Sequence, residues 1–191
     1  MNSAKHLTIV ALVLAQLLLG IECATWDRMD TWIDGSKTLS FPDDAVLGGF
    51  DPQGYDNFVG RALYSNGVWP ARVVAETGVA TYNTETISNK ATTYEILVSN
   101  GTVSYHWVRS FDGHREKNAV SVGTNAANDR VYVCRCRSDN GLIIGTLLLA
   151  DRRCYVRYDN MPQRTFDKYE ILVRQVKLAP WVPFVSEYNP N

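Results

Sequence analysis

Cysteine is the residue type whose spacing in this sequence says most about chemistry, and that spacing points to cross-linking. Three of the four cysteines follow the N-terminal apolar segment, at Cys134, Cys136 and Cys154. Cys134 and Cys136 are two residues apart, so on a strand they share a face and are poorly placed to bond each other. Either can form a disulfide with Cys154, closing a loop of about 20 residues that is worth roughly 3 kcal/mol on an entropic model. Buried thiols are the alternative, and an odd number leaves at least one thiol free or intermolecular.

The other reactive side chains form no pattern typical of a metal centre or an enzyme. A Cys-x-Cys site completed by His106 or His114 lacks the paired Cys-x-x-Cys spacing of structural zinc sites. The sequence has no Gly-x-Ser-x-Gly elbow, phosphate-cradling loop, His-Glu-x-x-His motif or dinucleotide fingerprint. Its carboxylates are dispersed, and the adjacent Asp43 and Asp44 point apart on an extended chain. We therefore expect a protein that is not an enzyme and that needs no metal or other cofactor.

The N-terminal residues predict export. Lys5 and His6 precede an apolar run over residues 7–19 that only Thr8 and Gln16 interrupt. A membrane-spanning helix needs about 20 apolar residues, so this run is too short for a comfortable span. A basic start, a short apolar core and then small or polar residues are typical of a cleaved signal peptide, here residues 1–24. We expect a secreted, extracellular protein without membrane insertion, and a signal anchor is the alternative.

Charge and composition narrow the range of partners. The chain carries 19 Lys and Arg against 20 Asp and Glu, for a formal net charge of −1. This balance gives no electrostatic footprint for nucleic acid or for an anionic membrane. The aromatic content of 11% suits a β-rich domain and equally suits stacking against sugars, so composition does not choose between them.

A duplication is the strongest signal in the sequence. The string Tyr-Glu-Ile-Leu-Val occurs at residues 94–98 and again at residues 169–173, 75 residues later. Trp32 and Trp107 are separated by the same number of residues. Further pairs keep the same order at an offset of 74: Ala45 with Ala119, Gly49 with Gly123, Arg61 with Arg135, and Gly67 with Gly141. Such a collinear series predicts two tandem copies, residues 32–98 and 107–173.

Each copy predicts strands and tight turns. Residues 58–64 alternate roughly between apolar and small or polar side chains, and Asn66-Gly67 follows. Residues 131–137 and Asn140-Gly141 repeat this arrangement. Asn-Gly between strand-like runs is a hairpin signal because both residues tolerate positive φ. Short links favour antiparallel pairing, and about 70 residues cannot easily bury a two-sided sheet alone. We predict an all-β fold in which two antiparallel repeats share a core with pseudo-twofold symmetry.

Two short segments lie outside the copies, a lead at residues 25–31 and a tail at residues 174–191. Pro180, Pro183 and Pro190 keep the tail from forming a helix or a central strand. We expect it to pack on the body as an extended strap, and a partner-binding peptide is the alternative.

The motifs of the first copy follow one another in a recognisable order. Ala-Val-x-x-Gly at residues 45–49 is followed by an Asp two residues on, and Val-x-Arg-Ala occupies residues 59–62. A Gly-bearing turn, a Pro-Ala-Arg step at residues 70–72 and Tyr-Glu-Ile-Leu at residues 94–97 complete the series. In this order they resemble the DM-nine repeat family of insect and mollusc proteins, over nearly the whole mature chain. The resemblance implies an all-β tandem-repeat protein, often a homodimer. Its best-understood members are mannose-recognising lectins of innate immunity, and no enzymatic activity is established for the family.

The same resemblance implies a sugar site. In the mannose-binding members an Asp before the Val-x-Arg-Ala strand and a Lys 21 residues later hold the sugar, and the matching residues here are Asp51 and Arg72. A carboxylate accepts hydrogen bonds from sugar hydroxyls while a cation donates to their oxygens. The structural alternative is that Asp51 and Arg72 form an ordinary inter-strand salt bridge. Arg72 also departs from the family pattern, because its planar guanidinium stands where the mannose-binding members have the compact ammonium of Lys. The second copy has Asn125 and Thr146, which predict a degenerate second site.

The recurring arginines of the repeated strand have a different expected role. An arginine occupies this position in both copies, as Arg61 and as Arg135. We therefore expect both to be structural and bonded to a carboxylate such as Glu95 or Glu170, with ligand contact as the alternative. Trp69 lies close to Arg72 in sequence and offers a stacking surface for a sugar, although packing in the core or its rim is the expected role.

These observations predict a secreted, lectin-like protein that binds mannose-type glycans in innate immune recognition. The alternative is a non-catalytic protein-interaction or structural secreted protein that has lost sugar binding. Asn100-Gly101-Thr102 is a glycosylation sequon on a turn between the copies, so we also expect a glycan on Asn100.

Overall fold

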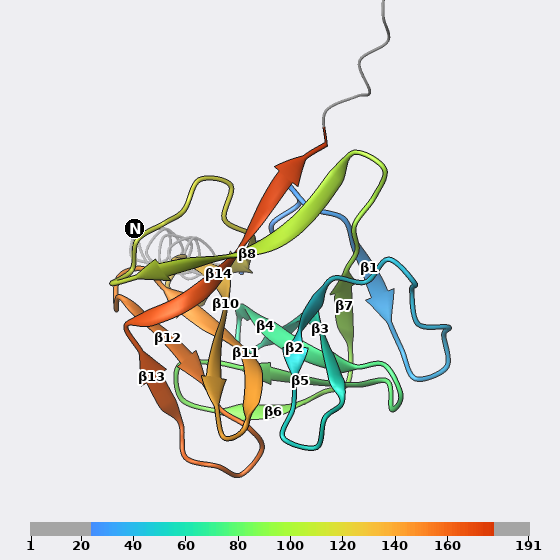
Figure 1. The fold of residues 1–191 in the computed structure, drawn as a ribbon, viewed down its shortest axis with the longest axis horizontal. Coiled ribbons are helices and arrows are strands. Elements are labelled where there is room, and N and C mark those ends of the chain that lie inside the picture. Colours follow the sequence, from blue (N-terminus) through green and yellow to red (C-terminus); the bar gives the residue numbers. More distant parts are fainter. Residues whose placement is uncertain (1–23, 178–191) are drawn as a thin grey trace, which may run out of the picture.

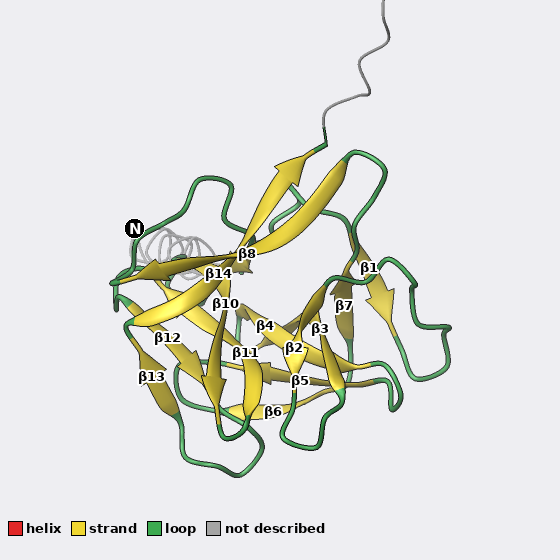
Figure 2. Ribbon diagram, viewed as in Figure 1, coloured by secondary structure: helices red, strands yellow, loops and turns green. Residues whose placement is uncertain are grey.

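The computed structural model describes residues 24–177, and within them the chain is all-β, as Figure 2 shows. This confirms the predicted fold class. The predicted signal peptide, except for Ala24, and the tail beyond Lys177 lie outside the described residues. No helix in residues 24–177 is long and apolar enough to cross a membrane. The strands are β1 (Trp32–Gly35), β2 (Leu47–Phe50), β3 (Asp56–Tyr64), β4 (Gly67–Val74), β5 (Val79–Asn83), β6 (Ser88–Ala91), β7 (Tyr94–Leu97), β8 (Val103–Phe111), β9 (Ser121–Thr124), β10 (Arg130–Ser138), β11 (Gly141–Leu148), β12 (Arg153–Val156), β13 (Arg164–Phe166) and β14 (Lys168–Val176).

The strands form two sets of seven that pair in the same antiparallel way (Figure 1). β3 pairs with β4 and β7 in the first set, just as β10 pairs with β11 and β14 in the second. The other pairs correspond too: β1–β7 with β8–β14, β2–β3 with β9–β10, β4–β5 with β11–β12, and β5–β6 with β12–β13. A pairing of Leu142 with Phe50 joins β11 to β2, so both sets belong to one sheet. The duplication in sequence is therefore a duplication of topology.

The β3–β4 and β10–β11 hairpins turn at equivalent places. Ser65 and Asn66 have φ of 48° and 58°, and Asp139 and Asn140 have φ of 51° and 66°. Two successive positive φ values are the mark of a type I′ turn, whose twist matches that of the flanking strands. The hairpins were predicted correctly, but the left-handed residues lie one position earlier than the Asn-Gly step implied. Gly67 instead opens β4, where a Cβ would lie 2.6 Å from the indole nitrogen of Trp69.

The two copies share a hydrophobic core. Val59 and Leu97 of the first copy and Val133 and Leu172 of the second are fully buried in one cluster. A smaller cluster lies within the second copy, around Cys134. Burying one such aliphatic side chain contributes about 1.5–3 kcal/mol, so the shared cluster stabilises both copies together.

Contacts between the copies are reciprocal. Arg61 Nη1 donates a hydrogen bond to the carbonyl oxygen of Val122 (3.0 Å), and Arg135 Nη1 donates to that of Gly48 (2.8 Å). The acceptors are 74 residues apart, like the two arginines. Exchanging the copies therefore maps one bond onto the other, which is the pattern that a pseudo-twofold relation produces.

The same arginines bind carboxylates within their own copies, as predicted. Arg61 Nε lies 2.5 Å from Glu95 Oε2, and Arg135 Nε lies 2.6 Å from Glu170 Oε2. The guanidinium of Arg135 also lies over the ring of Trp107. That of Arg61 lies over two indole rings, 4.6 Å from Trp26 and 4.3 Å from Trp32.

The N-terminal lead crosses to the second copy. Trp26 bridges to Gly123, and the backbone N–H of Thr124 donates to the carbonyl oxygen of Thr25 (2.9 Å). The lead thus extends the second copy beside β9 and then enters the first copy at β1. At the other end of the described chain, β14 continues to Val176, three residues beyond the repeat end expected from the sequence.

Candidate functional site

Asp51 caps the loop between β2 and β3. Its Oδ1 accepts hydrogen bonds from the backbone N–H groups of Gln53 (3.0 Å) and Tyr55 (2.9 Å), and the residue is buried. In the second copy Asn125 Oδ1 accepts from the backbone N–H groups two and four residues on, at 3.0 and 2.8 Å. Because carboxylate and amide share this acceptor atom, the loop needs the oxygen and not the charge. Asp51 therefore has a structural role in addition to any contact with ligand.

Arg72 reaches from β4 of the first copy to the loop after β12 of the second. Its Nη2 donates to Asp159 Oδ1 (2.5 Å), and its Nη1 donates to the carbonyl oxygen of Arg157 (3.0 Å). Its guanidinium lies 4.6 Å from the centre of the Tyr158 ring. Burial lowers the pKa of Arg72, and the negative charges of Asp159 and Asp51 oppose this shift by favouring the cation. The arginine stays charged and fixes the Asp159 carboxylate.

As an alternative, the sequence suggested an inter-strand salt bridge between Asp51 and Arg72. That prediction is wrong. Within residues 24–177 the ion-pair partner of Arg72 is Asp159, and no hydrogen bond joins Arg72 to Asp51. Asp51 acts on Arg72 only through its charge. Sequence reasoning missed Asp159 because it sought a partner for Arg72 within the first copy, whereas this contact joins the two copies.

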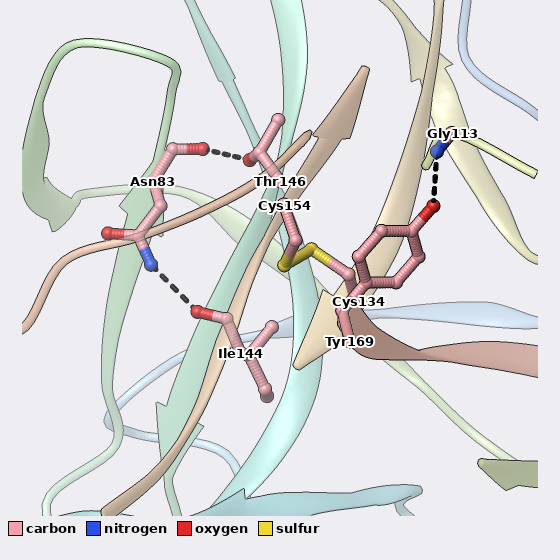
Figure 3. Close-up of a disulfide and its surroundings, with 7 residues drawn as sticks. All are labelled: Asn83, Gly113, Cys134, Ile144, Thr146, Cys154 and Tyr169. Carbon is pink, nitrogen blue, oxygen red and sulfur yellow. Dashed lines mark hydrogen bonds between the residues drawn. A yellow bond between two sulfur atoms is a disulfide. The ribbon is translucent and has the colours of Figure 1, made fainter. Parts of the chain in front are cut away.

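Thr146, the counterpart of Arg72, occupies a closed position. Its hydroxyl donates to the carbonyl oxygen of Asn83 (2.5 Å), and Asn83 Nδ2 donates to that of Ile144 (2.9 Å), as Figure 3 shows. Asn83 and Arg157 are 74 residues apart, so Arg72 and Thr146 make the same cross-copy bond. Thr146 is fully buried and leaves no exposed group for a sugar.

A surface pocket of about 360 Å³ lies beside the fixed carboxylate. Pro52 and Gln53 line it from the Asp51 loop, and Tyr158, Asp159 and Asn160 line it from the second copy. The side chain of Asp159 is 59% exposed although its Oδ1 is held by Arg72. The Tyr158 hydroxyl donates to Gln53 Oε1, which connects the two walls. An exposed carboxylate, two amides and an aromatic ring thus surround one opening.

Cys134 and Cys154 form a disulfide that joins β10 to β12 (Figure 3). Their Cα atoms are 6.1 Å apart, inside the usual range for this bond. Cys136 is free and buried, and burial raises the pKa of its thiol to about 12, with a smaller contribution from the negative charge of Glu170. A buried thiol with a raised pKa is a poor nucleophile and a poor metal ligand.

The other residues singled out from the sequence are not part of this pocket. Trp69 is buried and its indole N–H donates to the carbonyl oxygen of Tyr64 (3.0 Å), so it packs in the core and offers no stacking surface. Asn100 is exposed at the turn before β8. Over residues 24–177 no group of three or more His, Cys, Asp or Glu side chains is arranged to hold a metal ion.

Comparisons with known proteins agree with the repeated topology. The structure is similar to the crystal structure of the nematode sperm cell motility protein MFP2B, with a TM-score of 0.61 at 15% sequence identity. The similarity covers 82% of this chain but 48% of that one, so this chain spans about half of its structural relative. No curated protein sequence matches the chain significantly. A family model described as the DM9 repeat matches residues 51–165. The chain therefore belongs to the DM9 repeat family.

Proposed function

We propose that this protein is a secreted, non-catalytic lectin-like protein that binds mannose-type glycans in innate immune recognition. The observation that carries the proposal is the exposed Asp159 carboxylate, which the buried Arg72 holds at the mouth of the pocket. Fixed carboxylates accept well-directed hydrogen bonds from neighbouring hydroxyls, and charged acceptors make the stronger bonds. Membership of the DM9 repeat family supports the proposal.

The site combines residues from both copies. Asp51 shapes the loop that carries Gln53, Arg72 orients Asp159, and the Tyr158 ring offers an apolar surface for one face of a sugar. The closed position of Thr146 favours one sugar site in each chain. A homodimer would then present two such sites to a multivalent glycan and gain avidity without new contacts.

Retention on mannose-agarose tests the proposal. Asp159→Asn keeps an acceptor for Arg72 but removes the charge offered to hydroxyls, so we expect weaker retention and an unchanged fold. Asp51→Asn is the matched loop variant, because Asn125 already caps the same loop in the second copy. We expect Asp51→Asn to fold normally, whereas Asp51→Ala removes the loop cap.

Asn125→Asp makes the converse change in the second copy, at a residue that does not line the pocket, and serves as the control that leaves retention unchanged. Loss of retention in Asp159→Asn alone would support the site. A wild-type protein that binds no sugar on a glycan array would overturn the proposal and favour a protein-interaction or structural role.

A further inference from the structure

A second groove, of about 760 Å³, lies on the second copy where β11, β10, β14 and β8 run side by side. Arg135, Glu170 and Arg109 lie opposite one another on three successive strands. On each strand, the side chain two residues away from these positions points to the same face. The next row on this face consists of Leu142, Arg137, Lys168 and Phe111.

The groove carries an excess of positive charge. Glu170 is paired with Arg135, so these two charges cancel. Arg109, Arg137 and Lys168 are exposed, and among the described residues none of them forms an ion pair or donates a side-chain hydrogen bond. Three cations without a partner therefore surround one opening in a chain whose net charge is −1.

The first copy shows that the fold does not require these cations. The residues equivalent to Arg109, Arg137 and Lys168 are Asp34, Leu63 and Thr93. The first copy keeps the paired Arg and Glu at Arg61 and Glu95, as its scaffold needs. The three cations are therefore a feature of the second copy alone and not of the common framework.

The spacing of the cations suits a compact oxyanion. Neighbouring strands are about 4.8 Å apart and two residues along a strand span about 6.8 Å, so the backbones of the three cationic residues lie within roughly 12 Å. Side chains as long as Arg and Lys can converge over that distance. Guanidinium forks match the oxygens of sulfate and phosphate. Phe111, which is 60% exposed, lies at one end of the row and Leu142 at the other, so ring or chain carbons next to the anion would meet apolar surface.

We propose that this groove binds a sulfate or phosphate ester carried on a glycan. Its lining residues are separate from those of the Asp159 pocket, so the two proposals fail independently. An ester on a sugar supplies both parts that the groove fits: an oxyanion for the three cations and a ring face for Phe111.

Calorimetric titration with matched pairs of sugars tests the groove. The probes are a heparin-derived hexasaccharide against its desulfated form, and mannose 6-phosphate against mannose. We expect the wild type to prefer the esterified member of at least one pair, with affinity that falls as salt rises. Arg109→Asp, Arg137→Leu and Lys168→Thr install the residues of the first copy. Each should weaken binding by about tenfold as a charged hydrogen bond is lost, and Arg109→Asp should weaken it further because its carboxylate repels the anion.

Lys90→Thr on β6 is the matched control, because it removes an exposed lysine outside the groove, and it should change nothing. Asp159→Asn should leave ester binding intact, and the triple groove variant should leave retention on mannose-agarose intact. Equal affinity for esterified and plain sugars, or a triple variant that binds like the wild type, would overturn the inference. Binding to vesicles of anionic lipid without binding to either esterified sugar would overturn it as well.

Discussion

Replacing Arg61 by alanine should remove a large part of the stability of the whole chain. Arg61 is 4% exposed and donates to Glu95 (2.5 Å) and to the carbonyl oxygens of Asp27 (2.6 Å) and Val122 (3.0 Å). Breaking a buried ion pair by removing one partner costs about 3–5 kcal/mol. Each of the two contacts with an indole ring contributes at most about 1 kcal/mol more. These contributions are not fully additive, because one side chain makes all of the contacts.

We therefore expect Arg61→Ala to lower the free energy of unfolding by about 4–5 kcal/mol, against a total of about 5–15 kcal/mol for a typical domain. Arg135→Ala should cost less, about 3 kcal/mol, because the Arg135 side chain is 16% exposed and lies over one indole ring. Urea unfolding followed by tryptophan fluorescence measures both, with a slope against urea that matches the wild type.

Arg153→Ala is the control for this comparison. Its ion pair with Asp167 has both side chains about half exposed, at 47% and 55%, and such pairs contribute about 1 kcal/mol or less. An Arg61→Ala variant that loses less than 1 kcal/mol would refute the claim that the crossing arginines hold the copies together. An Arg135→Ala variant that loses more than Arg61→Ala would refute the ranking by burial.

Three further outcomes follow from the second copy and the turn between the copies. Cys134→Ser with Cys154→Ser should lower the free energy of unfolding by about 3 kcal/mol, and a urea midpoint that a reductant leaves unmoved would contradict this. Because burial raises the pKa of Cys136 to about 12, its thiol stays protonated at pH 9, and iodoacetamide should modify it only in urea; rapid modification of the folded protein would contradict its burial. Expressed through a secretory pathway, the wild type should lose mass on enzymatic removal of N-glycans and Asn100→Gln should not, and an unchanged wild-type mass would refute glycosylation at Asn100.

Local signals in the sequence predicted most of the architecture. The Asn-Gly steps located both hairpins, and the repeated Val-x-Arg strand located Arg61 and Arg135 together with their carboxylate partners. Each of these features depends on contacts within one copy, where register and the two-residue period of a strand determine which side chains meet. The pairing of Cys134 rather than Cys136 with Cys154 needed the structure, because both cysteines share one face of β10 and only the register across β11 brings Cys154 nearer to Cys134.

Contacts between the copies were beyond prediction from the sequence. Arg72 binds Asp159, which is 87 residues away, and no spacing rule connects the two. The loop-capping role of Asp51 also needed the structure, because the sequence does not show that its side-chain oxygen accepts from the backbone of its own loop. The basic groove was also hidden, because Arg137, Lys168 and Arg109 come together only when β14 lies between β10 and β8.

The reciprocal arginines bear on how such a chain could have arisen. A single copy has no Val122 or Gly48 carbonyl from a second copy to receive its arginine, so unlinked copies would satisfy each other as a twofold-symmetric dimer. In that dimer every surface occurs twice, and one mutation alters both halves at once. Fusion into one polypeptide removes this constraint. One half can then carry Asp34, Leu63 and Thr93 while the other carries three cations, so covalent linkage allows a symmetric scaffold to acquire an asymmetric surface.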